Sequence, residues 1–382
     1  MKNELRIAQI EPVGAHGGMH YYDVGLATGL VGAGVRVDLF TSSLGGLEGL
    51  LAAEIRSSDV FAGSFGSAPR WLRAIRFTRA LRSCLTTARR AEVDLVHLHF
   101  FGAGATERLS LRLAKRRGFP TLVTVHDVES LADPSDTDRV SRAYAEADAL
   151  IVHNEASREE LSERLPGGRI KVIPHGHYLH ATQRLAAHLA RRRLGLDETT
   201  PTILFFGQIK AAKGLDLLIE AMRGVVDRLP SARLLVAGRV WRQDPEQYRQ
   251  QINRLGLDGS VDFRHGFVPD NEVSTLFGAA DLVVLPYRRV YQSGVLLMAM
   301  SYGRAVLTSD LAAMREIVDD GRTGFTFRSG DVGDLTTRLV DLLGRREDLA
   351  AAAATALERL RVEHDWSHIG TRTAALYRQV LT

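Results

Sequence analysis

The sequence predicts an α/β protein with two doubly wound domains that face each other across a cleft. Short apolar runs alternate with amphipathic helical patterns along almost the whole chain, as expected for parallel sheets covered by helices. The 382 residues also exceed what a single hydrophobic core normally serves. The alternation stops near residues 174–197, where an arginine-rich helical stretch intervenes, and this break predicts the domain boundary.

The predicted strands are the short apolar runs. In the first half of the chain they fall at residues 5–10, 35–40, 94–98, 121–125, 149–152 and 171–173. In the second half they fall at residues 202–206, 233–237, 261–263, 282–285 and 305–308. Helical patterns lie between them, among them residues 21–30, 107–117, 215–228 and 271–279. In such sheets, ligands bind where the carboxyl ends of strands lead into helices.

The composition restricts the class of protein. The single cysteine, Cys84, excludes a disulfide framework and a multi-cysteine metal site, which fits a cytoplasmic protein. Glu11 and Pro12 interrupt the apolar start, and no apolar run reaches the roughly 20 residues that span a bilayer. The net charge is +4, but no zinc spacing, basic heptad or aromatic-basic stretch predicts a nucleic-acid partner.

A glycine-rich segment, residues 14–18, follows the first predicted strand and includes Gly17 and Gly18. Glycines let a backbone approach a phosphate closely, and the N-terminus of the following helix favours an anion. The full G-x-G-x-x-G fingerprint and an acidic residue after the second strand are missing, which argues against NAD. From these residues alone, a phosphate contact and an ordinary turn are equal alternatives.

A second loop, residues 206–214, follows the first strand of the second half and contains Gly207, Lys210, Lys213 and Gly214. The chain has only five lysines, and two of them fall in this loop. A compact ammonium between a strand and a helix suits a diphosphate. We therefore predict a phosphate site here rather than a solvated turn.

Gln292, Ser293 and Gly294 precede a short apolar helix that Gly303 is expected to end. Ser293 is predicted to be the N-cap. The first N–H groups of a helix carry partial positive charge, so this small polar entry predicts another anion site. The alternative, an ordinary buried helix, explains why the helix is apolar but does not explain the Gln-Ser-Gly residues that precede it.

Other notable side chains end or follow strands. His126 ends a strand, and we predict a functional rather than a structural histidine there. Arg239 also follows a strand and could reach a phosphate or a base, although an exposed turn explains it nearly as well. His97 and His99 alternate on one strand and are predicted to be half-buried structural residues on one face. For His175, a role in the cleft and a structural role are equal alternatives.

In their order and spacing, these segments resemble family 4 of the glycosyltransferases, whose members have two Rossmann-like domains facing each other (the GT-B fold). The resemblance covers nearly the whole chain. It is carried by residues 17–18, 124–127, 172–176, 207–214, 236–238, 292–303, 319–324 and 365–367. It implies a metal-independent hexosyltransferase of polysaccharide biosynthesis that needs no cofactor. Such an enzyme moves a sugar, with retention of configuration, from a nucleotide diphosphate sugar to a glycan, lipid-linked sugar or small-molecule acceptor.

The resemblance also implies roles for residues. Lys213 and Lys210 would hold the leaving diphosphate together with the helix N-terminus at residues 292–294, and His126 would face the donor sugar near the reacting carbon. Residues 17–18 would close over the phosphate, and Gly207, Gly214 and Arg239 complete the expected donor site. A helix at residues 366–382 would complete the first domain. The domains are then residues 1–178 with this helix, and residues 197–362.

The sequence departs from the family pattern in the donor site. The family commonly has two glutamates eight positions apart, and Val290 and Met298 occupy these positions here. Neither can accept a hydrogen bond from a hydroxyl. The Gln-Ser-Gly entry resembles a branch of the family, which implies altered donor contacts. A non-catalytic pseudo-glycosyltransferase subunit and a nucleotide-sugar epimerase on the same fold are the alternatives.

The segment Asp136–Thr137–Asp138 matches the D-x-D that binds metal in the other glycosyltransferase fold. It precedes a helical pattern, so it is predicted to cap that helix, and no metal site is predicted.

Arginines recur at every third position between residues 70 and 82, beside Trp71 and Ile75. A helix on an anionic membrane surface and a surface helix whose arginines extend over the core explain this pattern almost equally well. The first alternative would place the protein at the inner face of the membrane and favour a lipid-linked acceptor.

Overall fold

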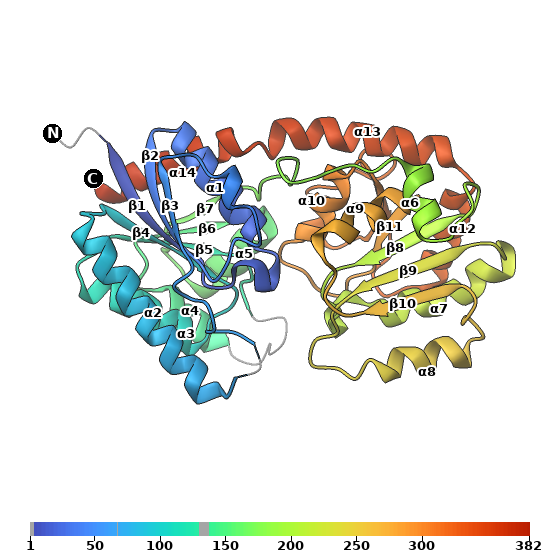
Figure 1. Cartoon of the computed structure of the whole chain (residues 1–382), viewed down its shortest axis with the longest axis horizontal. Coiled ribbons are helices and arrows are strands. Elements are labelled where there is room, and N and C mark those ends of the chain that lie inside the picture. Colours follow the sequence, from blue (N-terminus) through green and yellow to red (C-terminus); the bar gives the residue numbers. More distant parts are fainter. Residues whose placement is uncertain (1–3, 67, 130–136) are drawn as a thin grey trace. The chain divides into compact units, whose positions relative to one another are not determined.

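A computed structural model describes residues 4–66, 68–129 and 137–382 of the chain. The chain divides into two compact units, each described by itself: unit 1 comprises residues 1–178 and 363–382, and unit 2 comprises residues 179–362. Each unit is a parallel sheet with helices, which confirms the predicted α/β fold class (Figure 1). Within the described residues, no helix combines the length and apolar character needed to cross a membrane.

The sheet of unit 1 has seven parallel strands in the order β3-β2-β1-β4-β5-β6-β7. Most of its strands are buried on both faces, which explains why their sequences are mostly apolar. The order reverses beside β1, whose neighbours are β2 and β4, and ligands bind at such a point on the carboxyl edge. The strands are β1 (Leu5–Ile10), β2 (Val35–Phe40), β3 (Ile55–Ser58), β4 (Leu95–Phe100), β5 (Thr121–Val125), β6 (Ala149–Val152) and β7 (Ile170–Val172).

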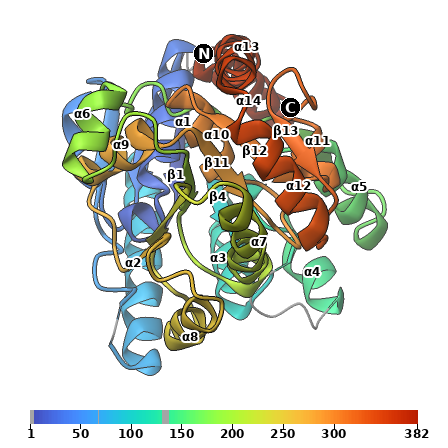
Figure 2. The same cartoon turned by 90° about the vertical axis from the view of Figure 1, so that its right-hand side faces the viewer.

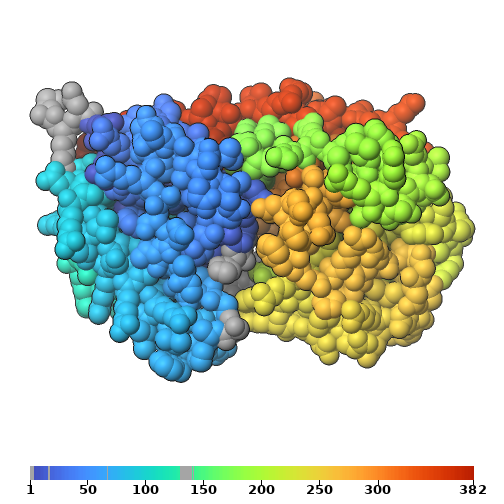
Figure 3. All heavy atoms as spheres, viewed as in Figure 1, coloured from blue at the N-terminus to red at the C-terminus, as the bar shows by residue number. Residues whose placement is uncertain are grey.

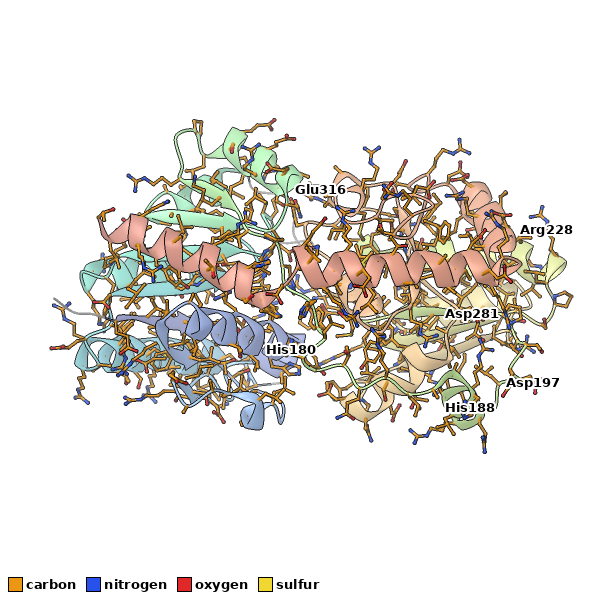
Figure 4. All side chains as sticks on the ribbon, turned by 90° about the horizontal axis from the view of Figure 1, so that it is seen from above. His180, His188, Asp197, Arg228, Asp281 and Glu316 are labelled. Carbon is orange, nitrogen blue, oxygen red and sulfur yellow. The ribbon has the colours of Figure 1, made fainter. Side chains whose placement is uncertain are left out.

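Helix α14, from the far end of the chain, packs against α1 in unit 1 (Figure 4). Glycines permit the close approach: a Cβ on Gly25 would lie 2.2 Å from Cε2 of Trp366, and one on Gly29 would lie 2.0 Å from the Trp366 carbonyl oxygen. Trp366 Nε1 donates a hydrogen bond to the carbonyl of His177 at 2.8 Å. The helices of unit 1 are α1 (His20–Gly32), α2 (Arg70–Arg90), α3 (Ala105–Arg116), α4 (Thr137–Tyr144), α5 (Glu155–Arg164) and α14 (Trp366–Leu381).

The sheet of unit 2 has six parallel strands in the order β10-β9-β8-β11-β12-β13. The order reverses beside β8, between β9 and β11. The strands are β8 (Thr202–Phe206), β9 (Arg233–Gly238), β10 (Val261–His265), β11 (Leu282–Leu285), β12 (Ala305–Ser309) and β13 (Phe325–Phe327). The helices are α6 (Ala187–Arg193), α7 (Leu215–Arg228), α8 (Glu246–Arg254), α9 (Asp270–Ala279), α10 (Gly294–Ser301), α11 (Ala312–Arg315), α12 (Val332–Leu343) and α13 (Arg346–Glu363). Helices α7 and α12 pack side by side (Figure 2).

The arginine-rich stretch at the predicted boundary is α6, which belongs to unit 2. Arg191 is buried, and its guanidinium forms an ion pair with Asp281, next to β11, at 2.8 Å. The same group donates to the carbonyls of Asp197 and Thr200 at 3.0 and 2.7 Å. These bonds tie the helix to the segment after it and to the residue that precedes β11.

Two edge strands, β3 and β13, are absent from the sequence-based assignment. Only Ile55 of β3 is buried, and β13 has three residues, so neither gives a strong apolar pattern. Strand β4 extends two residues beyond the predicted end at residue 98, to Phe100. The helix predicted from the arginine pattern continues to Arg90.

Candidate active site

The loop after β8 contains the two lysines singled out in the sequence. Gly207 has a left-handed φ of +98°, η3 (Ala211–Lys213) forms one turn, and Gly214, with φ +65°, precedes α7. A Cβ on Gly207 would lie 2.9 Å from Cγ2 of Val295, and one on Gly214 would lie 2.0 Å from the Pro286 carbonyl oxygen. The loop is therefore packed against both α10 and the segment after β11, which leaves no room for side chains at either glycine.

The ammonium of Lys213 lies over an aromatic ring. Its Nζ is 5.0 Å from the centre of the Tyr287 ring, a distance at which the ring face attracts a cation. A Cβ on Gly207 would lie 3.7 Å from the same nitrogen. Tyr287 is buried, and its hydroxyl has no hydrogen-bond partner among the described residues. Tyr287 is not among the residues predicted from the sequence, although an aromatic residue just after a buried strand could have indicated it.

The N-terminus of α10 lies beside this loop, through the Val295 contact with Gly207. Ser293 is the N-cap, as predicted: its Oγ accepts the N–H of Leu296 at 3.2 Å. Gly303 follows the helix with a left-handed φ of +67°. The Lys213 ammonium and the first turn of α10 thus both approach Gly207, and a lysine charge together with a helix N-terminus favours an anion.

The positions that commonly hold glutamates in the family the sequence resembles are Val290 and Met298, and both side chains are half-buried. The amide nitrogen of Gln292 is buried without a hydrogen-bond partner among the described residues. An unsatisfied buried donor costs free energy. A phosphate oxygen or sugar hydroxyl at this place would remove that cost.

Lys210 and Arg239 flank the loop. The N–H of Ile209 donates to the carbonyl of Arg239 at 2.8 Å, so the segments after β8 and β9 run side by side. The side chain of Lys210 is half-buried and that of Arg239 is exposed. Both lie at the carboxyl edge of the sheet.

In unit 1, the glycine-rich segment after β1 forms the turn η1 (Gly14–Gly17), which includes Gly17. Gly18 ends this turn with a left-handed φ of +75°. A Cβ on Gly18 would meet no atom within 4 Å, so the space beside it is open.

Glu11 anchors this turn, a role that was not predicted from the sequence. Its carboxylate accepts the N–H of Val13 at 2.9 Å and that of Gly14 at 2.5 Å. Glu11 and Asp23 of α1 are both fully buried. Burial raises the pKa of Glu11 to about 7. Burial, and then the charge of Glu11, raises the pKa of Asp23 well above its ordinary value. An acidic residue directly after a buried strand was the available signal.

Five buried histidines gather near the carboxyl edge of the unit 1 sheet. All are at most 7% exposed: His97 and His99 in β4, His126 after β5, His153 after β6 and His175 after β7. The prediction that His97 and His99 are half-buried is therefore wrong. The ring of Tyr22, from α1, packs edge-on against four of these rings, with centres 4.8–5.7 Å apart.

Three of the rings form a hydrogen-bonded chain. His153 Nδ1 lies 3.1 Å from the Ile173 carbonyl, His153 Nε2 lies 3.1 Å from His126 Nδ1, and His126 Nε2 lies 3.1 Å from His99 Nδ1. A carbonyl can only accept, so Nδ1 of His153 carries its proton. In neutral rings, each following Nδ1 must then donate as well. His99 Nε2 ends the chain as a buried acceptor with no partner among the described residues.

Burial keeps these rings neutral. It lowers the pKa of His97 to about 3 and that of His153 to about 4. The pKa values of His99, His126 and His175 also lie well below the ordinary value, because of burial and then repulsion from neighbouring histidines. At pH 7, His126 is therefore a hydrogen-bonded imidazole rather than a cation.

The candidate residues fall into two groups. Gly207, Lys213 and Gly214 meet the entry to α10 in unit 2, whereas His126 and residues 17–18 lie in unit 1. The ring of His126 stacks on the ring of Phe101, with the ring centres 4.7 Å apart. Each of its two nitrogens is hydrogen-bonded to another histidine ring. A contact between His126 and a donor sugar therefore remains a prediction.

No set of three or more His, Cys, Asp or Glu side chains is placed to hold a metal ion in the part of the chain that the structure describes. Asp136 and the side chain of Asp138, from the D-x-D segment, lie outside the described residues.

Comparison with known proteins finds two matching family models. Residues 16–180 match Glycosyltransferase Family 4, and residues 200–345 match Glycosyl transferases group 1. The D-inositol 3-phosphate glycosyltransferase of Corynebacterium efficiens is 25% identical, over 97% of this chain and 92% of its own. Sucrose-phosphate synthase from Thermosynechococcus elongatus aligns with a TM-score of 0.81 at 21% identity, over 99% of both chains. HepE of Anabaena, in complex with UDP and glucose, aligns with a TM-score of 0.77 at 20% identity, over 98% of this chain and 100% of its own.

Proposed function

Because the chain belongs to family 4 of the glycosyltransferases, we propose that it transfers a hexose from a nucleoside diphosphate sugar to an acceptor hydroxyl with retention of configuration. The observation that carries this proposal is the meeting of Lys213, the Gly207 backbone and the capped N-terminus of α10. This arrangement supplies positive charge and N–H donors at the place where a diphosphate leaving group needs them.

The proposed chemistry is one displacement at the anomeric carbon. The bond from this carbon to the phosphate oxygen breaks, a bond to the acceptor oxygen forms on the same face, and the acceptor proton passes to the departing diphosphate. Negative charge grows on that diphosphate as the bond breaks. Lys213, Lys210 and the dipole of α10 are proposed to lie beside it before the reaction, where they would stabilise the transition state more than the ground state.

The relatives guide the choice of substrates. The HepE complex contains UDP and glucose, and the C. efficiens relative is named for an inositol phosphate acceptor. UDP-glucose is therefore the first donor to test. Inositol phosphates, short glycans and lipid-linked sugars are the acceptor classes to combine with it.

The proposed function is tested by incubating the purified chain with a panel of nucleoside diphosphate sugars, each with and without these acceptors, in the presence of a chelator. We expect release of nucleoside diphosphate that depends on the acceptor, and a product with the anomeric configuration of the donor by NMR. Activity lost in chelator and restored by magnesium or manganese would contradict the metal-independent mechanism. A chain that neither hydrolyses nor transfers any donor would be a scaffold, and epimerised donor without acceptor would indicate an epimerase.

We expect His126→Ala to lower turnover far more than it weakens binding of UDP. The diphosphate contacts proposed above lie in unit 2, whereas His126 lies in unit 1, where its proposed contact is to the sugar. An interaction made mainly as the sugar leaves is visible in the rate rather than in nucleotide affinity.

His97→Asn is the matched control, because His97 is buried in the same cluster and bonds to Tyr377 and Thr124. It should lower the melting temperature while turnover at a permissive temperature persists. If His126→Ala behaves like this control, with activity that follows the folded fraction, His126 is structural.

We further propose that α2 contacts an anionic membrane surface. Trp71 is 66% exposed and Ile75 is 41% exposed. Arg70, Arg79 and Arg82 are exposed on the same helix, which lies at the surface in Figure 3. An apolar pair one turn apart with surrounding cations suits a lipid interface.

Co-sedimentation with vesicles tests this contact. The chain should bind vesicles rich in phosphatidylglycerol and not neutral ones, and Trp71→Ser with Ile75→Ser should abolish binding. Trp241→Ser, which removes another exposed tryptophan, should have no effect. Equal binding to both kinds of vesicle, or binding that survives the double substitution, would leave α2 as an ordinary surface helix.

A further inference from the structure

A cavity of about 720 Å³ lies within unit 2, next to the lysine loop. One wall is Ala211 and Ala212 of η3, the turn that ends in Lys213. The rest of the lining comes from α8, from Gln243 just before it, and from Asp216 and Arg288. Its volume is within the roughly 300–1,000 Å³ of small-molecule sites.

Glutamine is concentrated around the cavity. The chain has nine glutamines, and four of them, residues 243, 247, 250 and 251, fall within nine positions and line this one cavity. On α8, Tyr248 and Ile252 are buried in the core. Gln247, Gln250, Gln251 and Arg254 recur at helical spacing and line the cavity. A merely solvated helix face usually carries charged residues, so an amide-lined face calls for another explanation.

Hydrogen bonds fix the walls. The guanidinium of Arg288 binds both carboxylate oxygens of Asp216 at 2.7 and 2.6 Å, which neutralises both charges. The backbone N–H of Arg288 donates to the Ala212 carbonyl at 2.8 Å. The Tyr248 hydroxyl donates to Gln243 Oε1 at 3.0 Å, which orients that amide. The cavity is therefore largely preformed.

The side-chain amides of two lining glutamines remain available to bind a ligand. The side chains of Gln247 and Gln250 are exposed, and the structure records no hydrogen bond for either amide with the residues it describes. An amide group presents two donor hydrogens and a carbonyl acceptor. A sugar ring presents adjacent hydroxyls that both donate and accept, so amides match it better than they match an anion. The methyl groups of Ala211 and Ala212 offer an apolar wall for the C–H groups of a sugar.

We propose that this cavity is a carbohydrate subsite that holds a neutral sugar unit of a glycan acceptor. The proposal rests on the glycosyltransferase function and narrows its acceptor to a glycan longer than the reacting unit. The lining contains two arginines, and Arg288 is already neutralised by Asp216. Among the described residues, Arg254 is then the one lining cation without an ion pair. A single positive charge is too little to hold a polyphosphate.

The test measures direct binding of maltotriose, cellotriose and chitotriose to the full chain by ligand-observed NMR, without donor. At least one trisaccharide should bind saturably. Gln247→Ala with Gln250→Ala should weaken it by roughly tenfold, as expected for two lost hydrogen bonds. Gln379→Ala, which removes an exposed glutamine of α14, should leave binding unchanged. The double variant should retain its affinity for UDP, and with a glycan acceptor its KM should rise while kcat is kept.

Absence of binding by all three sugars, or binding that the double variant retains, overturns the proposal. Binding of inositol phosphate that depends on Arg254 overturns it in favour of an anion site. A failure of the proposed function is distinguishable, because it would appear as loss of UDP binding or of any transfer and would leave trisaccharide binding unaffected.

Discussion

Replacing Lys213 by alanine is expected to weaken binding of UDP by roughly 10- to 100-fold, and turnover by at least as much. A hydrogen bond between an ammonium and a phosphate contributes about 1.5–3 kcal/mol. Lys213 lies on a loop, so the fold should persist with a small loss of stability from the missing contact with Tyr287. Calorimetric titration with UDP, together with the melting temperature, measures both effects.

Two variants sharpen this experiment. Lys213→Arg keeps the charge and should recover part of the affinity. Lys171→Ala removes an exposed lysine from β7 in unit 1 and should change nothing. If the alanine variant at position 213 is folded and binds UDP as tightly as the parent, the diphosphate does not lie beside this loop, and the central support for the proposed donor site is lost.

Unit 1 is expected to lose stability steeply between pH 6.5 and 5. Each of the five buried histidines has a folded pKa below the unfolded value of about 6.5. Below that pH the unfolded chain takes up protons that the folded chain does not. The stabilisation is therefore complete above pH 6.5 and is lost as pH falls towards about 4 for His153 and about 3 for His97.

Glu11 and Asp23 act in the opposite direction. Their folded pKa values are raised, so their protonation stabilises the fold at low pH, and that contribution is lost as pH rises through about 7 for Glu11. A difference of one pKa unit between the folded and the unfolded state corresponds to about 1.4 kcal/mol of stability. Because five histidines lose stabilisation as pH falls and only two carboxyls gain it, we expect the histidines to dominate and unit 1 to become less stable.

Hydrogen exchange resolved by segment measures this effect and contains its own control. Protection of β4, β5 and β6 should fall between pH 7 and 5, after correction for the intrinsic rates. Unit 2 contains only His180, His188 and His265, so protection of β8 and β11 should change much less. Equal loss in both units, or no loss in unit 1, would show that the histidine cluster does not govern acid stability.

The elements that lie in the middle of each sheet were predictable from sequence because local chemistry determines them. Strands β1, β5, β8 and β11 are short, mostly apolar runs, and the structure gives them the predicted bounds. Ser293 caps α10 and Gly303 follows it because a hydroxyl and a left-handed glycine suit helix ends in any context. Strand β3 escaped prediction because only Ile55 is buried, and β13 escaped it because three residues are too few for a pattern.

The histidine cluster shows what the sequence alone could not decide. His97 and His99 alternate on one strand, and that pattern predicted half-burial. Their complete burial depends on Tyr22 from α1 and on Tyr377, which binds His97 from 280 positions away along the chain. No local pattern contains such a contact.

The sequence by itself determined which residue types lie at the end of each strand: glycines and lysines after β8, a polar helix entry after β11, and histidines within β4 and after β5, β6 and β7. Only the tertiary structure decided which of them meet. Lys213 reached the Gly207 backbone and the entry to α10 because β8 and β11 are neighbours in the sheet, although about 80 residues separate them in the chain. Side-chain chemistry is local, whereas the proximity that turns it into a site depends on strand order, which is set by packing of the whole sheet.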